Sequence, residues 1–136
     1  GPFQNALAYD EIAVEAVIPP PKGTVAGGYL KLERRVGDFA TAGVAVAVEL
    51  NGETVVKAGI GLTGVGPTTI NATEAAQVLV GKPLSAETIS GAAELAAAAA
   101  QPKSDHRGSA AYKRHIVATF VERILTRVNG SVQKAA

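Results

Sequence analysis

Two alternating runs joined by Asn51-Gly52 constrain the fold more than any other feature of the sequence. In residues 43–50, Val and Leu alternate with small residues and one Glu, which predicts a strand with two different faces. Asn-Gly between two such runs favours a type I′ hairpin turn, because both turn positions need a positive φ. The return strand is predicted over residues 53–63. If the turn has two residues, Ala45 pairs with Ala58 and Ala47 with Val56, and a helix could pack closely on this shallow face.

Further extended segments precede the hairpin. Residues 10–18 alternate between apolar and mostly polar or small side chains, which predicts a strand. Pro19, Pro20 and Pro21 end it, since proline has no N–H to donate to a neighbouring strand. Residues 22–28 are predicted to be a connection, and residues 29–33 are predicted to be extended again.

Helices are predicted in the second half of the chain. Asn71 and Glu74 fit a capping box for a short helix that reaches about Val80 and stops at Gly81. Ser85 is predicted to cap a second helix, which runs through the alanine-rich segment to about residue 100.

A third helix is predicted to start near Ser109 and to end at Asn129-Gly130. An apolar residue recurs at every fourth position and forms one stripe along it, namely Tyr112, Ile116, Phe120, Ile124 and Val128. Residues 131–136 are predicted to be a frayed tail. Strands therefore come first and helices after, which predicts one α+β domain with a small antiparallel sheet of three to four strands followed by a layer of about three helices.

Composition excludes several classes of function. The chain has no Cys, which rules out disulfides and thiolate metal sites within it, and its two His are too few for a His-rich metal site. The net charge is +1, so we expect no broad attraction for nucleic acid, and the basic residues of the third helix are interpreted as a solvated face: Lys113, Arg114, Arg123 and Arg127. No apolar run is long enough to span a membrane. A cytoplasmic location is expected.

Two local patterns resemble catalytic motifs only superficially. The glycines of residues 59–66 lie between a strand and a helix, as phosphate loops do, but their spacing fits neither a Walker motif nor G-x-G-x-x-G. A plain turn is the preferred interpretation. Asp105, His106 and Ser109 are too close in sequence for a catalytic triad, and Asp105 and Ser109 are interpreted as residues that start a helix.

The segment from Tyr29 to Asp38 places several charges at the start of a buried strand. Arg34 and Arg35 are adjacent, so they should point to opposite sides of an extended segment, and one of them could pair with Asp38. A structural ion pair that fixes the chain before it enters the core explains this pattern. The wall of a cofactor site explains it as well, and the residues alone leave both interpretations open.

Four segments in order resemble one known family. GGYLKLERRVGDFATAGVAVAVEL, GIGLTGVGPTTINATEA, GKPLSAETI and DHRGSAAYKRHIV are similar to the C-terminal domain of the FAD-binding medium subunit of molybdenum hydroxylases. The similarity is strongest to the carbon-monoxide-dehydrogenase type and extends to the xanthine dehydrogenase family. It covers about residues 1–125, and the domain is expected over residues 1–130.

The resemblance implies a role in electron transfer. The parent subunit would take electrons from a 2Fe-2S small subunit onto FAD and pass them to an external acceptor, while a large subunit with the molybdenum cofactor oxidises the substrate. This domain would cover the flavin ring, with Tyr29 beside the ring and Lys31 near it. Arg34, Arg35 and Asp38 would shape a loop that meets the flavin site or a neighbouring subunit. Asn71 departs from the family, which often has a basic residue there.

The resemblance also implies that the chain is part of a longer protein. The chain contains no Met, and the family's FAD-binding domain would lie upstream of it. By itself the chain is expected to be inactive and to hold little FAD, although it would belong to a multi-subunit FAD and molybdenum oxidoreductase. The alternative is a cofactor-free interaction module with the same fold.

Overall fold

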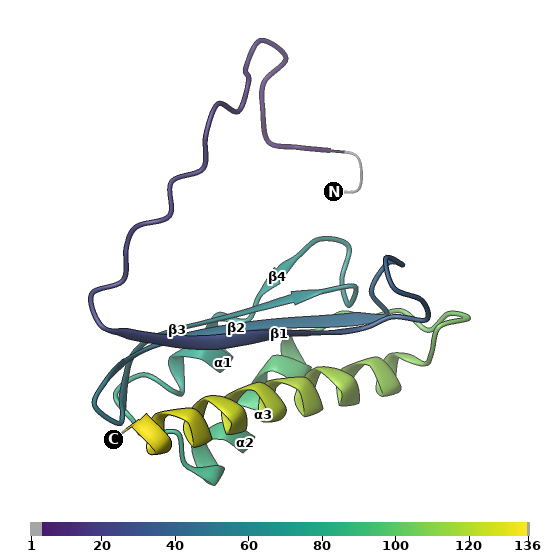
Figure 1. Cartoon of the computed structure of the whole chain (residues 1–136). Coiled ribbons are helices and arrows are strands. Elements are labelled where there is room, and N and C mark those ends of the chain that lie inside the picture. The colour runs from purple at the N-terminus through teal and green to yellow at the C-terminus, as the bar shows by residue number, and fades with distance from the viewer. Residues whose placement is uncertain (1–3, 136) are drawn as a thin grey trace.

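The computed structural model describes residues 4–135 and shows an antiparallel sheet backed by helices (Figure 1). The four strands follow the chain in the order β1-β2-β3-β4, and the three helices come after them. The elements are β1 (Thr24–Leu32), β2 (Ala42–Asn51), β3 (Thr54–Thr63), β4 (Ile70–Asn71), α1 (Thr73–Gln77), α2 (Ala86–Ala99) and α3 (Ala110–Ala135). The predicted α+β class and the order of strands before helices are confirmed.

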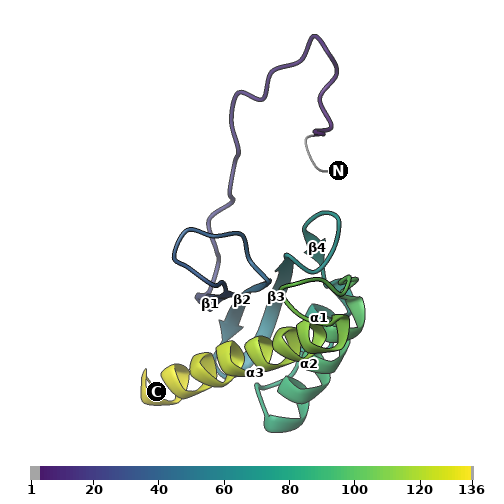
Figure 2. The same ribbon diagram turned by 90° about the vertical axis from the view of Figure 1, so that its right-hand side faces the viewer.

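The helices cover one face of the sheet and leave the other open. In β2 the side chains of Val44, Val46 and Val48 are buried, whereas Ala45 and Ala47 between them are exposed. Figure 2 shows α1, α2 and α3 together on one side of the sheet. The valines therefore form the core with the helices. The prediction that a helix packs on the alanine face is wrong, since the branched side chains remove more apolar surface from water.

Close packing of the two long helices explains the alanine-rich sequence of α2. Ala92, Ala93 and Ala96 are fully buried, and their small side chains let α3 approach closely. The buried face of α3 includes Val121 and Leu125. It is wider than the predicted stripe, as expected for a helix that packs against a sheet and a second helix. Phe120, Ile124 and Val128 are buried as predicted, whereas Tyr112 is 44% exposed.

The hairpin between β2 and β3 forms, but its predicted register is wrong. Ala45 pairs with Gly61 and Ala47 with Gly59, not with Ala58 and Val56. The strands turn at Gly52-Glu53, with Gly52 at φ +59°, rather than at Asn51-Gly52. A β-bulge also shifts the register between Glu49 and Leu50. A one-residue bulge leaves no mark on the periodic pattern of the sequence, so the pairing beyond it was not predictable.

The N-terminal segment differs from its prediction. Residues 10–18 are not a strand: they form an extended arm that leaves the sheet at β1 on the side opposite the helices, as both views show (Figures 1 and 2). Ile12, Val14 and Ile18 along this arm are 84%, 87% and 90% exposed. The alternating pattern is that of a strand, but within residues 4–135 it has no neighbouring strand to pair with. The predicted connection at residues 22–28 instead forms most of β1.

Two predicted helix boundaries are also corrected. Ala72 precedes α1, and no side chain caps this helix. The predicted capping box at Asn71 is therefore wrong, and Asn71 belongs to β4. The α3 helix continues through Asn129 and Gly130 to its end at Ala135. A helical Gly costs only about 1 kcal/mol relative to Ala, which neighbouring residues outweigh. Ser85 caps α2 as predicted, and its side chain accepts a hydrogen bond from the Thr88 N–H.

Candidate functional site

The open face of the sheet has a floor without protruding side chains. Ala45 and Ala47 of β2 lie opposite Gly61 and Gly59 of β3, and we call these four residues the floor. A Cβ atom added at Gly59 or Gly61 would meet nothing within 4 Å. The two glycines that were predicted to lie in a turn are therefore strand residues with open space above them. This floor can accept a flat group that a surface of larger side chains would exclude.

Tyr29 stands at the edge of this floor. It belongs to β1, pairs with Ala45, and is 55% exposed. Its ring extends over Gly43, where an added Cβ would lie 3.0 Å from the Tyr29 hydroxyl oxygen and 3.5 Å from Cε2. The missing side chain at Gly43 therefore gives the ring its place, and Tyr29 presents an aromatic surface beside the floor.

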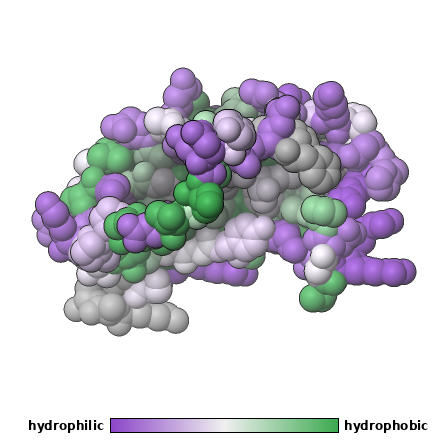
Figure 3. Space-filling model, turned by 90° about the horizontal axis from the view of Figure 1, so that it is seen from above, coloured by the Kyte–Doolittle hydropathy of each residue, from purple (hydrophilic) through white to green (hydrophobic). Residues whose placement is uncertain are grey.

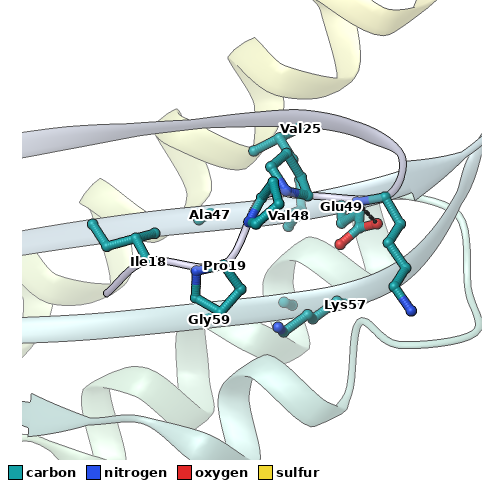
Figure 4. A pocket seen from close by; sticks show the side chains of 12 residues that line it. Ile18, Pro19, Val25, Ala47, Val48, Glu49, Lys57 and Gly59 are labelled. Atoms are coloured by element: carbon teal, nitrogen blue, oxygen red, sulfur yellow. Dashed lines mark hydrogen bonds between the residues drawn. The ribbon is translucent and has the colours of Figure 1, made fainter. Parts of the chain in front are cut away.

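The arm and the sheet enclose a hollow at the other end of the open face. Ile18 and Pro19 of the arm face Ala47 and Gly59 of the floor (Figure 4). The arm is held there by a hydrogen bond of 3.0 Å from the Lys22 N–H to the Glu49 carboxylate. Figure 3 views the molecule from the side of the arm and shows clusters of hydrophobic side chains between hydrophilic ones. The open face is thus bordered by apolar residues at the arm and by Tyr29 at its far end.

A group of ionic side chains adjoins Tyr29. We call Lys31, Glu33, Arg34, Asp38 and Arg107 the charged corner. Lys31 lies two residues after Tyr29 on the same face of β1, forms an ion pair with Glu33, and donates a hydrogen bond of 3.2 Å from Nζ to the Asp38 carbonyl oxygen. The hydrogen bond to Glu33 raises the pKa of Lys31 above its ordinary value of 10.5, so Lys31 is a cation at neutral pH.

Asp38 is the centre of the charged corner. Its Oδ1 accepts hydrogen bonds from the Phe39 N–H at 2.8 Å and from Arg107 Nη2 at 3.3 Å, and its Oδ2 lies 3.6 Å from Arg34 Nε. The Phe39 N–H, and after it the charges of Arg107 and Arg34, hold the pKa of Asp38 below its ordinary value of 3.8. Asp38 therefore remains an anion and fixes the loop between β1 and β2.

One of the two adjacent arginines pairs with Asp38, as expected, but both lie in a bend after β1 and not in an extended segment. The side chain of Arg34 pairs with Asp38 and is 67% exposed. Arg35 is exposed, and its backbone carbonyl accepts the Asp38 N–H at 3.0 Å within the same turn. Of the five residues predicted at the site, Tyr29 and Lys31 share the open face, Arg34 and Asp38 form an ion pair beside them, and Arg35 shapes the turn through its backbone.

Sequence reasoning missed Arg107. This residue lies 69 positions from Asp38 along the chain, and it donates from Nη1 to the Phe39 carbonyl oxygen at 3.0 Å and from Nη2 to Asp38. Glu33 was also missed. Lys31 and Glu33 are alternate residues of an extended segment, which was a usable signal for Glu33. No local period indicates a pairing as distant as that of Arg107.

Arg107 is itself held by Asp105, which is paired with a buried lysine. The Asp105 carboxylate accepts the Arg107 N–H at 2.8 Å and the Lys113 ammonium at 2.7 Å, and Lys113 also donates to the Lys103 carbonyl oxygen at 2.9 Å. The hydrogen bond from Lys113, followed by that from the Arg107 N–H, lowers the pKa of Asp105. The interpretation of Lys113 as part of a solvated face is wrong: the residue is 4% exposed, and its ammonium group donates to Asp105 and to a backbone carbonyl oxygen inside the fold.

Stability should fall in acid because of these two aspartates. The folded pKa values of Asp38 and Asp105 lie below 3.8, so the unfolded chain binds protons first as the pH falls. We expect the melting temperature to be constant at neutral pH and to decrease below about pH 4, as the pH approaches the folded pKa values. Circular dichroism melts between about pH 7 and pH 2.5 measure this. The double variant Asp38→Asn, Asp105→Asn should give a flatter profile, and an unchanged acid decrease would contradict the assignment.

The other sequence candidates have structural roles. Ser109 accepts the Tyr112 N–H at 3.1 Å at the start of α3, as predicted. Asp105 lies in the turn before α3 and pairs with Lys113, so its interpretation as a residue that starts a helix is wrong. Among residues 4–135, no group of three or more His, Cys, Asp or Glu is placed to hold a metal ion. Within the same residues, no helix is both long and apolar enough to cross a bilayer.

The arrangement is suited to a planar, electron-accepting ring. The floor offers a flat surface, Tyr29 offers an aromatic face, and Lys31 offers a cation at the edge. Of the five members of the charged corner, Lys31, Arg34 and Arg107 are cationic and Glu33 and Asp38 are anionic, which leaves one net positive charge. A net positive charge favours negative charge gained by a neighbouring group.

Comparison with known proteins identifies one family. The family model described as the CO dehydrogenase flavoprotein C-terminal domain matches residues 28–128. The medium chain of carbon monoxide dehydrogenase from Afipia carboxidovorans is 37% identical over 127 residues, which cover 93% of this chain and 44% of that protein. The medium chain of glyceraldehyde dehydrogenase from Sulfolobus acidocaldarius is 31% identical over 130 residues, which cover 94% of this chain and 45% of the relative.

Solved structures show the same similarity. Reconstituted CO dehydrogenase from Oligotropha carboxidovorans aligns with a TM-score of 0.75 and 40% sequence identity, and the alignment covers 82% of this chain and 38% of that chain. Quinoline 2-oxidoreductase from Pseudomonas putida 86 aligns with a TM-score of 0.74 and 29% identity over 85% of this chain and 40% of that chain. The chain thus spans less than half the length of the relatives it matches.

Proposed function

Since this chain belongs to the CO dehydrogenase flavoprotein C-terminal domain family, we propose that it forms the part of a flavoprotein subunit that covers the ring of FAD. The subunit passes electrons from iron–sulfur clusters through FAD to an external acceptor. It does so within a molybdenum hydroxylase of the carbon-monoxide-dehydrogenase type. The names of the relatives include different substrates, so the proposal does not extend to a substrate.

The open face of the sheet is the observation that carries this proposal. The floor lacks side chains beyond Cβ, and added Cβ atoms at its two glycines would project into open space. Tyr29 and Lys31 lie next to each other along one side of it. These residues fit a flavin, because an isoalloxazine ring needs a flat surface, an aromatic neighbour and a cation near the electrons it gains.

Each residue then has a defined task. FAD supplies the ability to accept and release electrons. Tyr29 shields one side of the ring from water, and Gly43 leaves space for the tyrosine side chain. The ammonium group of Lys31 stabilises negative charge, and its hydrogen bond to the Asp38 carbonyl oxygen keeps it in place. Arg34 and Arg35 shape the loop at the charged corner, where it faces the flavin site or a partner subunit.

The remaining parts of the enzyme complete the proposed assembly. An FAD-binding domain precedes this one in the subunit, and the exposed apolar residues of the arm pack against it. A 2Fe-2S small subunit delivers electrons, and a large subunit holds the molybdenum cofactor. The domain itself occupies residues 1–130. Without the other parts the chain is inactive and holds little FAD.

An absorption spectrum and an intact mass of the protein from its source cell test this proposal. We expect flavin bands in the visible spectrum and a mass well above the 13.8 kDa of this chain. Copurification of an iron–sulfur subunit and a molybdenum subunit would support the assembly.

The opposite outcome has a clear meaning. A mass equal to that of this chain, with no flavin bands and no partner subunits, would support a cofactor-free interaction module with the same fold. The open face would then be a protein-docking surface, and the flavin proposal would be abandoned.

A further inference from the structure

We propose that Arg107 is a positioning residue that holds the Lys31 ammonium group at the edge of the open face. This inference rests on the proposed function in one respect, namely that Lys31 faces the flavin. The contact between the two residues is indirect. It passes through the turn at Asp38 and Phe39: Arg107 donates hydrogen bonds to both residues, and Lys31 donates one to the Asp38 carbonyl oxygen.

The guanidinium group of Arg107 fixes that turn at two points. Nη1 donates to the Phe39 carbonyl oxygen at 3.0 Å, and Nη2 donates to Asp38 Oδ1 at 3.3 Å. The same Oδ1 accepts the Phe39 N–H at 2.8 Å, so the Asp38 carboxylate and the backbone of the turn are tied together. Two donors at a fixed spacing hold a peptide segment in a way that a single ammonium group cannot.

Lys31 depends on the position of this turn. Its Nζ donates to the Asp38 carbonyl oxygen at 3.2 Å. The loop that carries Asp38 connects β1 and β2, and beyond it the chain re-enters the sheet where the Thr41 N–H donates to the Leu32 carbonyl oxygen at 2.8 Å. Between these points the tip is exposed, with Val36 and Phe39 at 99% and 84% exposure. Packing does not hold such a tip in place, so its polar contacts must.

Arg107 can act as a fixed point because its own backbone is anchored. Residues 105 and 108 exchange two backbone hydrogen bonds of 3.1 Å, which closes a tight turn around Arg107. The Asp105 carboxylate accepts the Arg107 N–H and is paired with buried Lys113 at 2.7 Å. The order of contacts is therefore Lys113, Asp105, Arg107, Asp38 and Lys31, running from the core to the open face.

Nuclear magnetic resonance of the 136-residue chain tests the positioning directly. The informative variant is Arg107→Lys, which keeps the charge but loses the two-point contact. We expect the Phe39 amide to exchange about fivefold faster, as for the loss of one ordinary hydrogen bond. We also expect the Lys31 ammonium signal to move toward that of an exposed lysine. Arg123→Lys is the matched control, because Arg123 is an exposed arginine on α3, and it should leave both signals unchanged.

A second measurement connects the inference to the flavin. In the FAD-containing subunit, Arg107→Lys and Lys31→Gln should both lower the midpoint potential, whereas Arg123→Lys should not. If Arg107 acted only through its positive charge, Arg107→Lys would keep that charge and leave the midpoint potential of the flavin unchanged. Arg107→Gln provides a further variant if Arg107→Lys does not fold.

The two measurements separate the possible failures. Unchanged Lys31 and Phe39 signals in the folded Arg107→Lys chain would overturn the positioning role, whatever the flavin does. Altered signals together with an unchanged potential in both Arg107→Lys and Lys31→Gln would support the positioning role but overturn the placement of Lys31 at the flavin.

Discussion

Replacing Gly27 with Ala should destabilise the protein by about 2 kcal/mol, even though Gly27 lies on the open face of the sheet. A Cβ atom at this position would lie 2.2 Å from the Val46 carbonyl oxygen and 3.0 Å from the Ala47 Cα. Both are backbone atoms, so no side-chain rotation can relieve the clash, and β1 must move away from β2. We expect the melting temperature to fall by roughly 8 °C in a thermal melt followed by circular dichroism.

Gly59→Ala is the matched control for this variant. Gly59 is also a glycine of a strand on the open face, but a Cβ atom there would meet nothing within 4 Å. Its replacement should be neutral or stabilise the fold by up to about 1 kcal/mol, since alanine reduces the entropy of the unfolded chain. Equal losses of stability in both variants would contradict the close approach of β1 and β2 at Gly27.

The largest loss of stability is expected from truncation of Ile60 to Ala. Ile60 lies at the centre of β3, is 1% exposed, and faces the helices. Removing a buried Ile side chain to the β-carbon leaves a cavity and costs about 3 kcal/mol, equivalent to roughly 12 °C in melting temperature. Chemical denaturation with urea should show a lower midpoint with an unchanged slope.

Val56→Ala is the comparison on the same strand. Val56 is 45% exposed and is the residue of β3 that the bulge leaves without a partner on β2. Its truncation should cost less than about 1 kcal/mol, because little apolar surface is lost from the core. If the two variants lost similar stability, the assignment of the helices to one face of the sheet would be wrong.

The start of a helix was predictable where the residues that cap it lie close together in the sequence. Ser85 and Thr88 form a cap within four residues, and the structure confirms this start of α2. The end of α3 was mispredicted because Asn129 and Gly130 carry a stop signal that the helix passes over. Asn and Gly disfavour a helix only weakly, so a helix continues through them where its backbone hydrogen bonds and its packing are retained.

The hairpin of β2 and β3 was predictable in its strands and not in its pairing, whereas β1 was not predicted over most of its length. Alternation placed β2 and β3 within a residue or two, but the turn at Gly52-Glu53 and the bulge beyond Glu49 moved Ala45 from its predicted partner to Gly61. The choice of face was also reversed. Alternation shows that two faces differ, and here the face with branched side chains is the one that the helices bury.

In the candidate site, contacts between residues close in the sequence were predictable, and contacts between distant residues were not. Tyr29 and Lys31 lie on one face because strand residues alternate, and the pair of Arg34 with Asp38 joins residues four apart. The contact between Arg107 and Asp38 joins segments 69 residues apart and depends on how α3 and the preceding turn pack beneath the loop. Only the three-dimensional structure brings these groups together.

A comparison of Tyr29→Ala with Tyr112→Ala in the FAD-containing subunit shows whether the open face of the sheet covers the flavin. Tyr29 lies on the open face, whereas Tyr112 is a similarly exposed tyrosine, at 44%, on α3. We expect Tyr29→Ala to weaken FAD binding about tenfold and to change the flavin absorption spectrum, since a favourable aromatic contact is lost. Tyr112→Ala should leave both unchanged. Unaltered FAD affinity and spectrum in Tyr29→Ala would contradict the claim that the open face covers the flavin.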